Sequence, residues 1–166
     1  MVFPSARDRR GWERIWADPS ALSDYWREPE PAVLEWVRGL AEGARLLDLG
    51  CGVGRHTVPL VQMGLKVVGG DISPSGLAAC AARLRQVGLL PLLVRHDMTR
   101  LPFADGAFDA LLSFHVVYHT TRQGLRAVLA EARRVLRSGG RLYLTFLGRV
   151  EENIARQRTR NLEPGT

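Results

Sequence analysis

The chain has 166 residues, of which 46% are hydrophobic and 24% charged, a composition typical of one globular domain with a buried core. No stretch approaches the roughly 20 apolar residues of a membrane span and no signal peptide is recognisable, so we expect a cytoplasmic protein with no membrane partner. The net charge is +6, but 22 of the 23 basic residues are arginine, which indicates a coding bias more than a nucleic-acid surface.

An N-terminal arm precedes the regular part of the chain. Residues 7–27 predict one or two short helices, and Pro31 opens a further helix that ends near residue 42. The large apolar members of the arm are Trp12, Trp16, Tyr25 and Trp26. We expect these rings to pin the arm to the core or, for Tyr25 and Trp26, to form part of a lid over a ligand.

Strands and helices then alternate along the chain. Strands are predicted at 45–49, 65–70, 91–96, 107–114 and 141–147. Helices are predicted at 54–64, 74–88 and 122–137, and a last polar helix at 149–160. The first four strands are mostly unbroken apolar runs, typical of strands covered on both faces. The pattern predicts an α/β fold with a doubly wound, Rossmann-like parallel sheet flanked by helices.

A glycine-rich turn directly follows the first predicted strand. Gly50, Gly52 and Gly54 alternate with other residues between the strand and the next helix. Glycine accepts a positive φ at such a turn, and without a Cβ it lets a ligand lie against the backbone. The N-terminus of the next helix offers free N–H groups to a polar ligand. We therefore expect a ligand at the carboxyl end of this strand.

Three carboxylates lie at the carboxyl ends of the first three strands: Asp48, Asp71 and Asp97. Asp71 lies 21 residues after Gly50, the offset at which a carboxylate accepts hydrogen bonds from a ribose diol. A dinucleotide-binding loop would read G-x-G-x-x-G, whereas here position 55 is arginine and the third glycine comes one residue early. Hydride transfer is therefore disfavoured.

Together these motifs resemble those of the class I S-adenosylmethionine-dependent methyltransferases. LLDLGCGVG at 46–54 is similar to the first motif of that family, GDIS at 70–73 to the second, and HDM at 96–98 to the third. LPF at 101–103 with Phe108-Asp109 resembles the fourth, and ARRVLRSGG at 132–140 the segment that leads into strand five. The likeness covers roughly residues 30–148.

The resemblance implies the cofactor S-adenosyl-L-methionine and no metal. It implies that Asp48 lies near the methionine end, that Asp71 holds the ribose hydroxyls, and that Asp97 accepts from the adenine amino group. Arg55 is expected either to meet the cofactor carboxylate or to lie on the surface. The other cofactor contacts implied are Gly50, Cys51, Gly52, Gly54, Ile72, Ser73, Met98, Ser113 and Phe114.

The implied reaction moves a methyl group from a sulfonium to a nucleophile, so a general base is needed only if that nucleophile begins protonated. His119, and after it His115, are the candidate bases or substrate contacts, with Tyr118 as a further substrate contact. The alternative for each is a loop side chain bonded to backbone.

A small-molecule acceptor is expected. The run after strand four, Ser113-Phe114-His115-Val116, lacks the prolines typical of base-amine methylation, and neither cysteine lies there. His-Val-Val-Tyr-His and the aromatic arm are similar to the type 11 and type 25 bacterial small-molecule group that includes tellurite-resistance-like members. RNA methylation is a less favoured alternative, and an inactive cofactor-binding remnant that acts through association is another.

The methyltransferase sheet usually has seven strands, and the last two are not found in this sequence. The strand at 141–147 is then an exposed edge, which a second copy could cover in a homodimer. We expect an N-terminal helical arm at 1–30, a cofactor-binding domain at 31–148, and a polar tail at 149–166 that begins a truncated C-terminal region.

Overall fold

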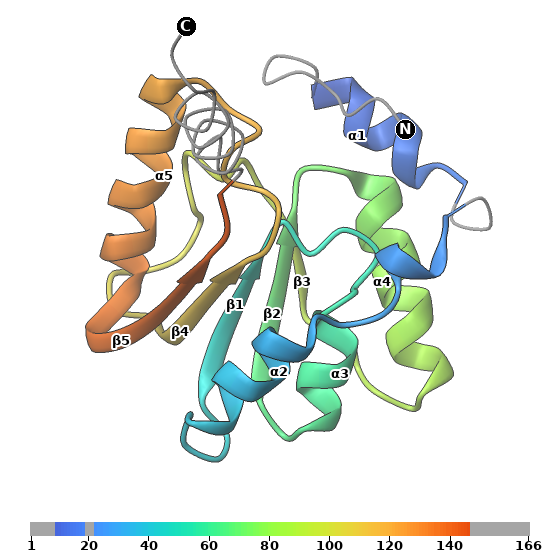
Figure 1. Ribbon diagram of the computed structural model, residues 1–166, viewed down its shortest axis with the longest axis horizontal. Coiled ribbons are helices and arrows are strands. Elements are labelled where there is room, and N and C mark those ends of the chain that lie inside the picture. Colours follow the sequence, from blue (N-terminus) through green and yellow to red (C-terminus); the bar gives the residue numbers. More distant parts are fainter. Residues whose placement is uncertain (1–8, 19–21, 147–166) are drawn as a thin grey trace, which may run out of the picture.

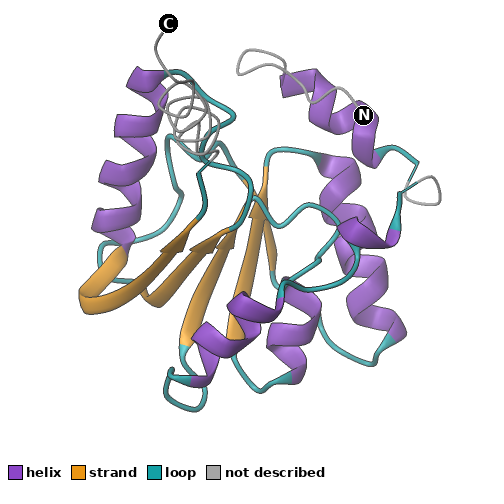
Figure 2. Ribbon diagram, viewed as in Figure 1, coloured by secondary structure: helices purple, strands orange, loops and turns teal. Residues whose placement is uncertain are grey.

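A computed structural model describes residues 9–18 and 22–146, so the polar tail at 149–166 and its expected helix lie outside the described residues. The five strands form one parallel sheet in the order β3-β2-β1-β4-β5 (Figures 1 and 2). They are β1 (Arg45–Leu49), β2 (Lys66–Asp71), β3 (Leu93–Arg95), β4 (Phe108–Ser113) and β5 (Leu136–Leu144). The doubly wound α/β prediction is confirmed, and the described residues form the five strands that the sequence predicted.

The helices follow the predicted order, with shorter bounds. They are α1 (Arg9–Trp16), the 3₁₀ helix η2 (Asp24–Trp26), α2 (Pro31–Arg38), α3 (Thr57–Gln62), α4 (Pro74–Gln86) and α5 (Arg122–Val135). Side-chain caps fix two of the starts. The Ser73 hydroxyl accepts from the Gly76 N–H, and the Thr121 hydroxyl accepts from the Gly124 N–H, both at 3.1 Å. No described helix is long and apolar enough to span a membrane.

Successive side chains of β1, the central strand, pack into two different apolar layers, one on each face of the sheet. Leu46 packs with Val33 and Val37 of α2, whereas its neighbour Leu47 packs with Val128 of α5. Both leucines are fully buried, as expected for a strand covered on both faces. In Figure 1, α5 lies on one side of the sheet and α2 and α3 on the other, while α1 lies beyond the carboxyl ends of the strands.

The two edge strands differ from the prediction. β3 is shorter than expected, and Leu92, predicted within a buried strand, is 58% exposed because β3 lies at the edge of the sheet. β5 begins at Leu136, five residues earlier than expected, and includes Gly139 and Gly140, which were expected to precede the strand. Leu136 pairs with Phe108 and Arg141 with Ala110, so the residues between them bulge from the ladder.

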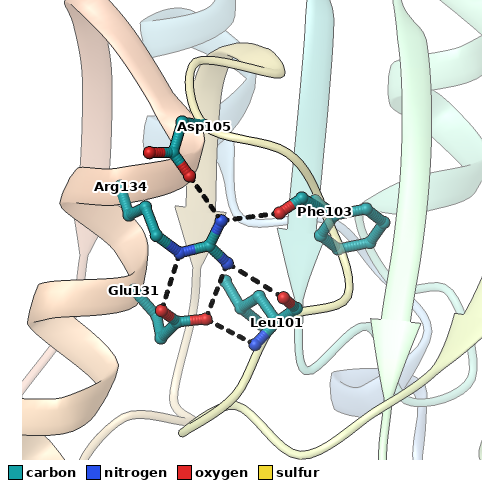
Figure 3. Close-up of polar contacts among 5 residues, drawn as sticks. All are labelled: Leu101, Phe103, Asp105, Glu131 and Arg134. Carbon is teal, nitrogen blue, oxygen red and sulfur yellow. Dashed lines mark hydrogen bonds and ion pairs between the residues drawn. The ribbon is translucent and has the colours of Figure 1, made fainter.

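An arginine of α5 holds the loop between β3 and β4 in place. The Arg134 guanidinium donates to the carbonyls of Leu101 and Phe103 at 2.9 and 2.7 Å and pairs with Glu131 and Asp105 (Figure 3). Glu131 in turn accepts from the Leu101 N–H at 2.7 Å, and its hydrogen bonds from Arg134 lower its pKa to about 2. The loop that begins at Asp97 is therefore fixed to α5 between residues 101 and 105.

Candidate functional site

A cavity of about 160 Å³ lies at the carboxyl ends of the strands. Its walls come from α1, η2 and the loops that follow β1, β2, β3 and β4. The predicted site residues that line it are Trp26, Asp48, Gly50, Cys51, Gly52, Arg55, Asp71, Ile72, Asp97, Met98, Phe114, His115 and His119. The sequence thus identified residues from five separate segments that the fold brings to one place.

Five predicted site residues lie outside this lining, and three of them have other contacts that account for their positions. Ser73 caps α4, and the Ser113 hydroxyl donates to the Leu49 carbonyl at 3.0 Å. Gly54 packs against Cys80, whose sulfur would lie 2.6 Å from a Cβ at that position. Tyr25 and Tyr118 both lie beside His115, a cavity residue, with the Tyr25 hydroxyl 3.3 Å from His115 Nδ1.

The glycine loop forms the base of the cavity. The Gly70 carbonyl accepts from the N–H groups of Gly50 and Cys51 at 2.7 and 3.0 Å, which ties the loop to β2. Gly50 has φ +80 and touches Val116, which would lie 2.3 Å from a Cβ there. Only glycine fits this position without displacement. The loop is a backbone cradle of the kind that an elongated polar ligand needs.

Asp71 joins the glycine loop to the start of α4. One carboxylate oxygen accepts from the Gly52 N–H at 2.8 Å and the other from the Ser73 N–H at 2.9 Å. Burial raises the pKa of Asp71, while these N–H groups lower it. Each oxygen of an ionised carboxylate accepts more than one hydrogen bond, so Asp71 can hold the loop and still receive hydroxyl groups of a ligand.

Asp48 is the second buried carboxylate at the cavity. The Thr57 hydroxyl donates to it at 2.6 Å, and burial raises the pKa of Asp48 to about 6. Thr57 lies on α3, nine residues further along, and the sequence analysis did not identify this pairing. We call the glycine loop 50–54, together with Asp48 and Asp71, the floor of the cavity.

The loop after β3 supplies the wall beside the floor. Asp97 accepts from the backbone N–H and the hydroxyl of Thr99, at 2.9 and 2.8 Å, which shapes the turn. His96 precedes it and also lines the cavity, although it was not among the predicted site residues. The residue is 8% exposed, and among the described residues neither ring nitrogen has a hydrogen-bond partner.

Aromatic rings of the arm and of the loop after β4 also line the cavity. Trp12 packs on Trp16 at 5.8 Å and on His119 at 4.8 Å between ring centroids, and Trp16 packs on Trp26 at 5.3 Å. We call Trp12, Trp16, Trp26, His115 and His119 the roof. The sequence placed Trp12 and Trp16 in the arm without assigning them to the site, because ring contacts across distant segments leave no local pattern.

Glu13 of α1 and Arg55 of the loop after β1 hold the segments that carry the roof. The Glu13 carboxylate accepts from the hydroxyls of Ser73 and Ser75, so α1 is anchored at the start of α4. The Arg55 guanidinium lies over the rings of Tyr25 and Phe114, at 4.4 and 5.0 Å from their centroids. Its side chain is 12% exposed, and the guanidinium also donates to the Glu28 carbonyl and pairs with Glu30 at 3.8 Å.

The neutral form is favoured for the two histidines of the roof and for the neighbouring His56. Burial lowers the pKa of His119 and of His115 below 6.5, and it lowers the pKa of His56 to about 3. His56 accepts from the Glu30 N–H at 3.2 Å, so its ring is engaged in holding the arm. His115 has φ +59, a strained backbone for a non-glycine residue, and its N–H donates to the Thr145 hydroxyl at 2.6 Å. Among the described residues no cluster suited to a metal ion is found.

The chain matches known proteins over the segments that build this cavity. The family model described as "Methyltransferase domain" matches residues 47–144. A demethylmenaquinone methyltransferase of Mycolicibacterium paratuberculosis is 41% identical over 119 residues, which are 71% of this chain and 46% of the relative. A ubiquinone biosynthesis O-methyltransferase of Cereibacter sphaeroides is 32% identical over 114 residues, which are 69% of this chain and 45% of the relative.

A solved structure has the same fold. Magnesium protoporphyrin IX methyltransferase from Synechocystis PCC 6803, crystallised with bound SAH, has a TM-score of 0.62 to this chain at 24% identity. The match covers 81% of this chain and 62% of that one. The chain spans about half the length of the curated relatives it matches.

Proposed function

This chain belongs to the class I S-adenosylmethionine-dependent methyltransferases, which use that cofactor as methyl donor, and we propose that it methylates a small aromatic molecule. The observation that carries the cofactor site, and with it the proposed methyl transfer, is the geometry of the floor. A left-handed glycine loop, tied to β2 and to the Asp71 carboxylate, lines a cavity at the carboxyl ends of the strands. Parallel α/β sheets bind nucleotide-like ligands at this edge.

The residues present fit the cofactor. Asp71 accepts from the ribose hydroxyls while it holds Gly52, and Ile72 lies beside the adenine. Asp97 accepts from the adenine amino group, next to Met98. Arg55 is the cation that lines the cavity and receives the cofactor carboxylate at the methionine end, near Asp48. When bound, the cofactor supplies a methyl group on a sulfonium.

The roof supports an aromatic acceptor. Its members are five rings, three of tryptophan and two of neutral histidine, and planar molecules stack on or pack edge-on against such rings. The names of two relatives, a demethylmenaquinone methyltransferase and a ubiquinone biosynthesis O-methyltransferase, refer to quinones, which is consistent with an aromatic acceptor. Closed over the cavity, the roof keeps water from the reacting atoms and orients the acceptor.

His119 acts as the general base if the acceptor is a phenol or hydroquinone. Its pKa lies below 6.5, so the ring is unprotonated at neutral pH and can take the hydroxyl proton as the methyl group is transferred. His115, bonded to Tyr25, orients the acceptor from the other side of the roof. A cytoplasmic location, a homodimer and an RNA acceptor remain predictions from the sequence alone.

Calorimetric titration with S-adenosylhomocysteine tests the cofactor site. We expect the folded chain to bind it and Asp71→Asn to bind about tenfold or more weakly, because the amide keeps the shape of the carboxylate but cannot accept at both atoms. Asp105→Asn is the control, since Asp105 is 82% exposed and lies outside the cavity lining. A folded chain that does not bind the ligand would overturn the proposal.

A further inference from the structure

We propose that His96 is a further binding residue for the cofactor, and that its imidazole hydrogen-bonds the nucleoside end of S-adenosylmethionine. The inference rests on the cofactor site proposed above. It starts from an uncompensated feature of the cavity: His96 is 8% exposed, and its two ring nitrogens have no hydrogen-bond partner among the described residues. Burying polar groups without hydrogen bonds is unfavourable, so a ligand that enters the cavity and hydrogen-bonds the ring would remove this cost.

The backbone places His96 directly beside a residue already assigned to the ribose. The His96 N–H donates to the Asp71 carbonyl at 3.0 Å, and the next residue along the chain is Asp97. His96, Asp71 and Asp97 all line the cavity. The backbone of His96 is therefore next to the residue assigned to the ribose and to the one assigned to the adenine amino group, and its imidazole lines the same cavity.

The ring has little freedom to turn away. It packs over Gly70, where a Cβ would lie 2.0 Å from Nε2, so β2 has room for the imidazole only because residue 70 is glycine. Its other neighbour is Phe103, at 5.8 Å between centroids and nearly perpendicular. Phe103 belongs to the loop that Arg134 holds through the Phe103 carbonyl (Figure 3). The histidine is thus held from both sides.

The protonation state of the His96 imidazole determines which ligand atoms it can hydrogen-bond. Burial lowers the pKa of His96, so the imidazole is neutral and offers one donor and one acceptor. Asp71 and Asp97, which line the same cavity, are carboxylates and offer acceptors only. The imidazole N–H suits an acceptor atom of the nucleoside, such as an adenine ring nitrogen, because an ionised carboxylate has no proton to donate to it.

Binding of S-adenosylhomocysteine by three variants tests the assignment. His96→Phe keeps a ring and removes both nitrogens, and we expect it to bind about tenfold more weakly than the wild type. Phe103→Leu is the matched control, because it loosens the same packing without removing a polar atom, and it is expected to stay within about threefold. His96→Asn keeps a donor and an acceptor near Nδ1 and is expected to recover part of the affinity if that nitrogen makes the contact.

A second measurement is made on the wild type. In the ¹⁵N-histidine-labelled wild type, addition of S-adenosylhomocysteine is expected to shift the ring nitrogens of His96 to one fixed tautomer, and the signals that are missing from His96→Phe identify them. Unmoved His96 nitrogens, or His96→Phe within about twofold of the wild type, would overturn the inference and leave a structural water as the partner. If the wild type does not bind at all, the cofactor site itself fails first.

Discussion

The floor and the roof of the cavity are built by different means. Hydrogen bonds from backbone N–H groups to the Gly70 carbonyl and the Asp71 carboxylate hold the floor. The side chain of Val116 leaves no room for a residue larger than glycine at position 50. Ring contacts between distant segments form the roof, and the Glu13 carboxylate anchors its first helix. The floor residues belong to β1, β2 and the loop between β1 and α3, so they are continuous with the sheet. The roof residues belong to α1, η2 and the loop after β4.

This difference separates two kinds of functional residue. A change in the floor disturbs backbone that the fold needs, so stability and cofactor binding fall together. A change in the roof leaves the sheet intact, so turnover or ligand release is expected to change with little loss of stability. The predictions below test whether the two regions can be separated in this way.

Gly50→Ala is expected to have the largest effect on stability. The left-handed φ of +80 strains any L-residue by about 1–2 kcal/mol, and the added methyl would lie 2.3 Å from Val116. Overpacking adds a cost of similar size, so we expect the free energy of unfolding in urea to fall by about 3–4 kcal/mol. Gly64→Ala is the control, with φ +85 and no atom within 4 Å of its Cβ. Equal losses in the two variants would show that the floor is not sterically fixed.

Sequence reasoning predicted the floor because its determinants are contiguous. The spacing of Gly50, Gly52 and Gly54, and the acidic residues at the carboxyl ends of β1 and β2, are visible without any tertiary contact. The same holds for the helix starts at Ser73 and Thr121, which depend on residues within one turn. These are the parts where local preference and the final fold agree.

The parts that could not be predicted depend on distant contacts. Trp12 became a roof residue because α1 packs against His119, more than 100 residues away, and no periodicity encodes that contact. The exposure of Leu92 follows from the place of β3 at the sheet edge, which an apolar run alone does not reveal. His96 has no motif of its own, since its signal is the lack of a hydrogen-bond partner in the folded cavity.

His119→Asn tests the roof as the place of chemistry. With a panel of simple catechols and hydroquinones as acceptors, we expect kcat to fall about 100-fold for lack of a base, while the free energy of unfolding changes by less than about 1 kcal/mol. A rate equal to that of the wild type on an accepted substrate would remove His119 from the mechanism. Methylation of none of these acceptors would contradict the aromatic acceptor class.

The pH profile sharpens the same test. The unprotonated ring is the active form and burial places the pKa of His119 below 6.5, so kcat of the wild type should fall as the pH drops through that pKa. His119→Asn should lack this fall. Asp48, with a pKa of about 6, titrates in the same range, but it belongs to the floor and should affect the affinity for S-adenosylhomocysteine in both proteins alike.

Glu13→Gln is expected to have the smallest effect on stability. Hydrogen bonds from Ser73 and Ser75 lower the pKa of Glu13 below its ordinary 4.5. The anchor therefore contributes fully above the unfolded pKa and is lost as the pH falls through the lowered folded one. The amide keeps part of these bonds, so we expect the free energy of unfolding to change by less than about 1 kcal/mol.

Release of the ligand should respond more strongly than stability to the loss of this anchor. Because Trp12 and Trp16 lie in the roof, tryptophan fluorescence in a stopped-flow experiment can follow the release of S-adenosylhomocysteine. We expect faster release from Glu13→Gln and an unchanged rate from Glu35→Gln, whose carboxylate is exposed on α2 and pairs with Arg38. Unchanged release from Glu13→Gln would mean that ring packing alone holds the roof. A loss of several kcal/mol in stability would mean instead that α1 is part of the core, and the distinction between floor and roof would no longer hold.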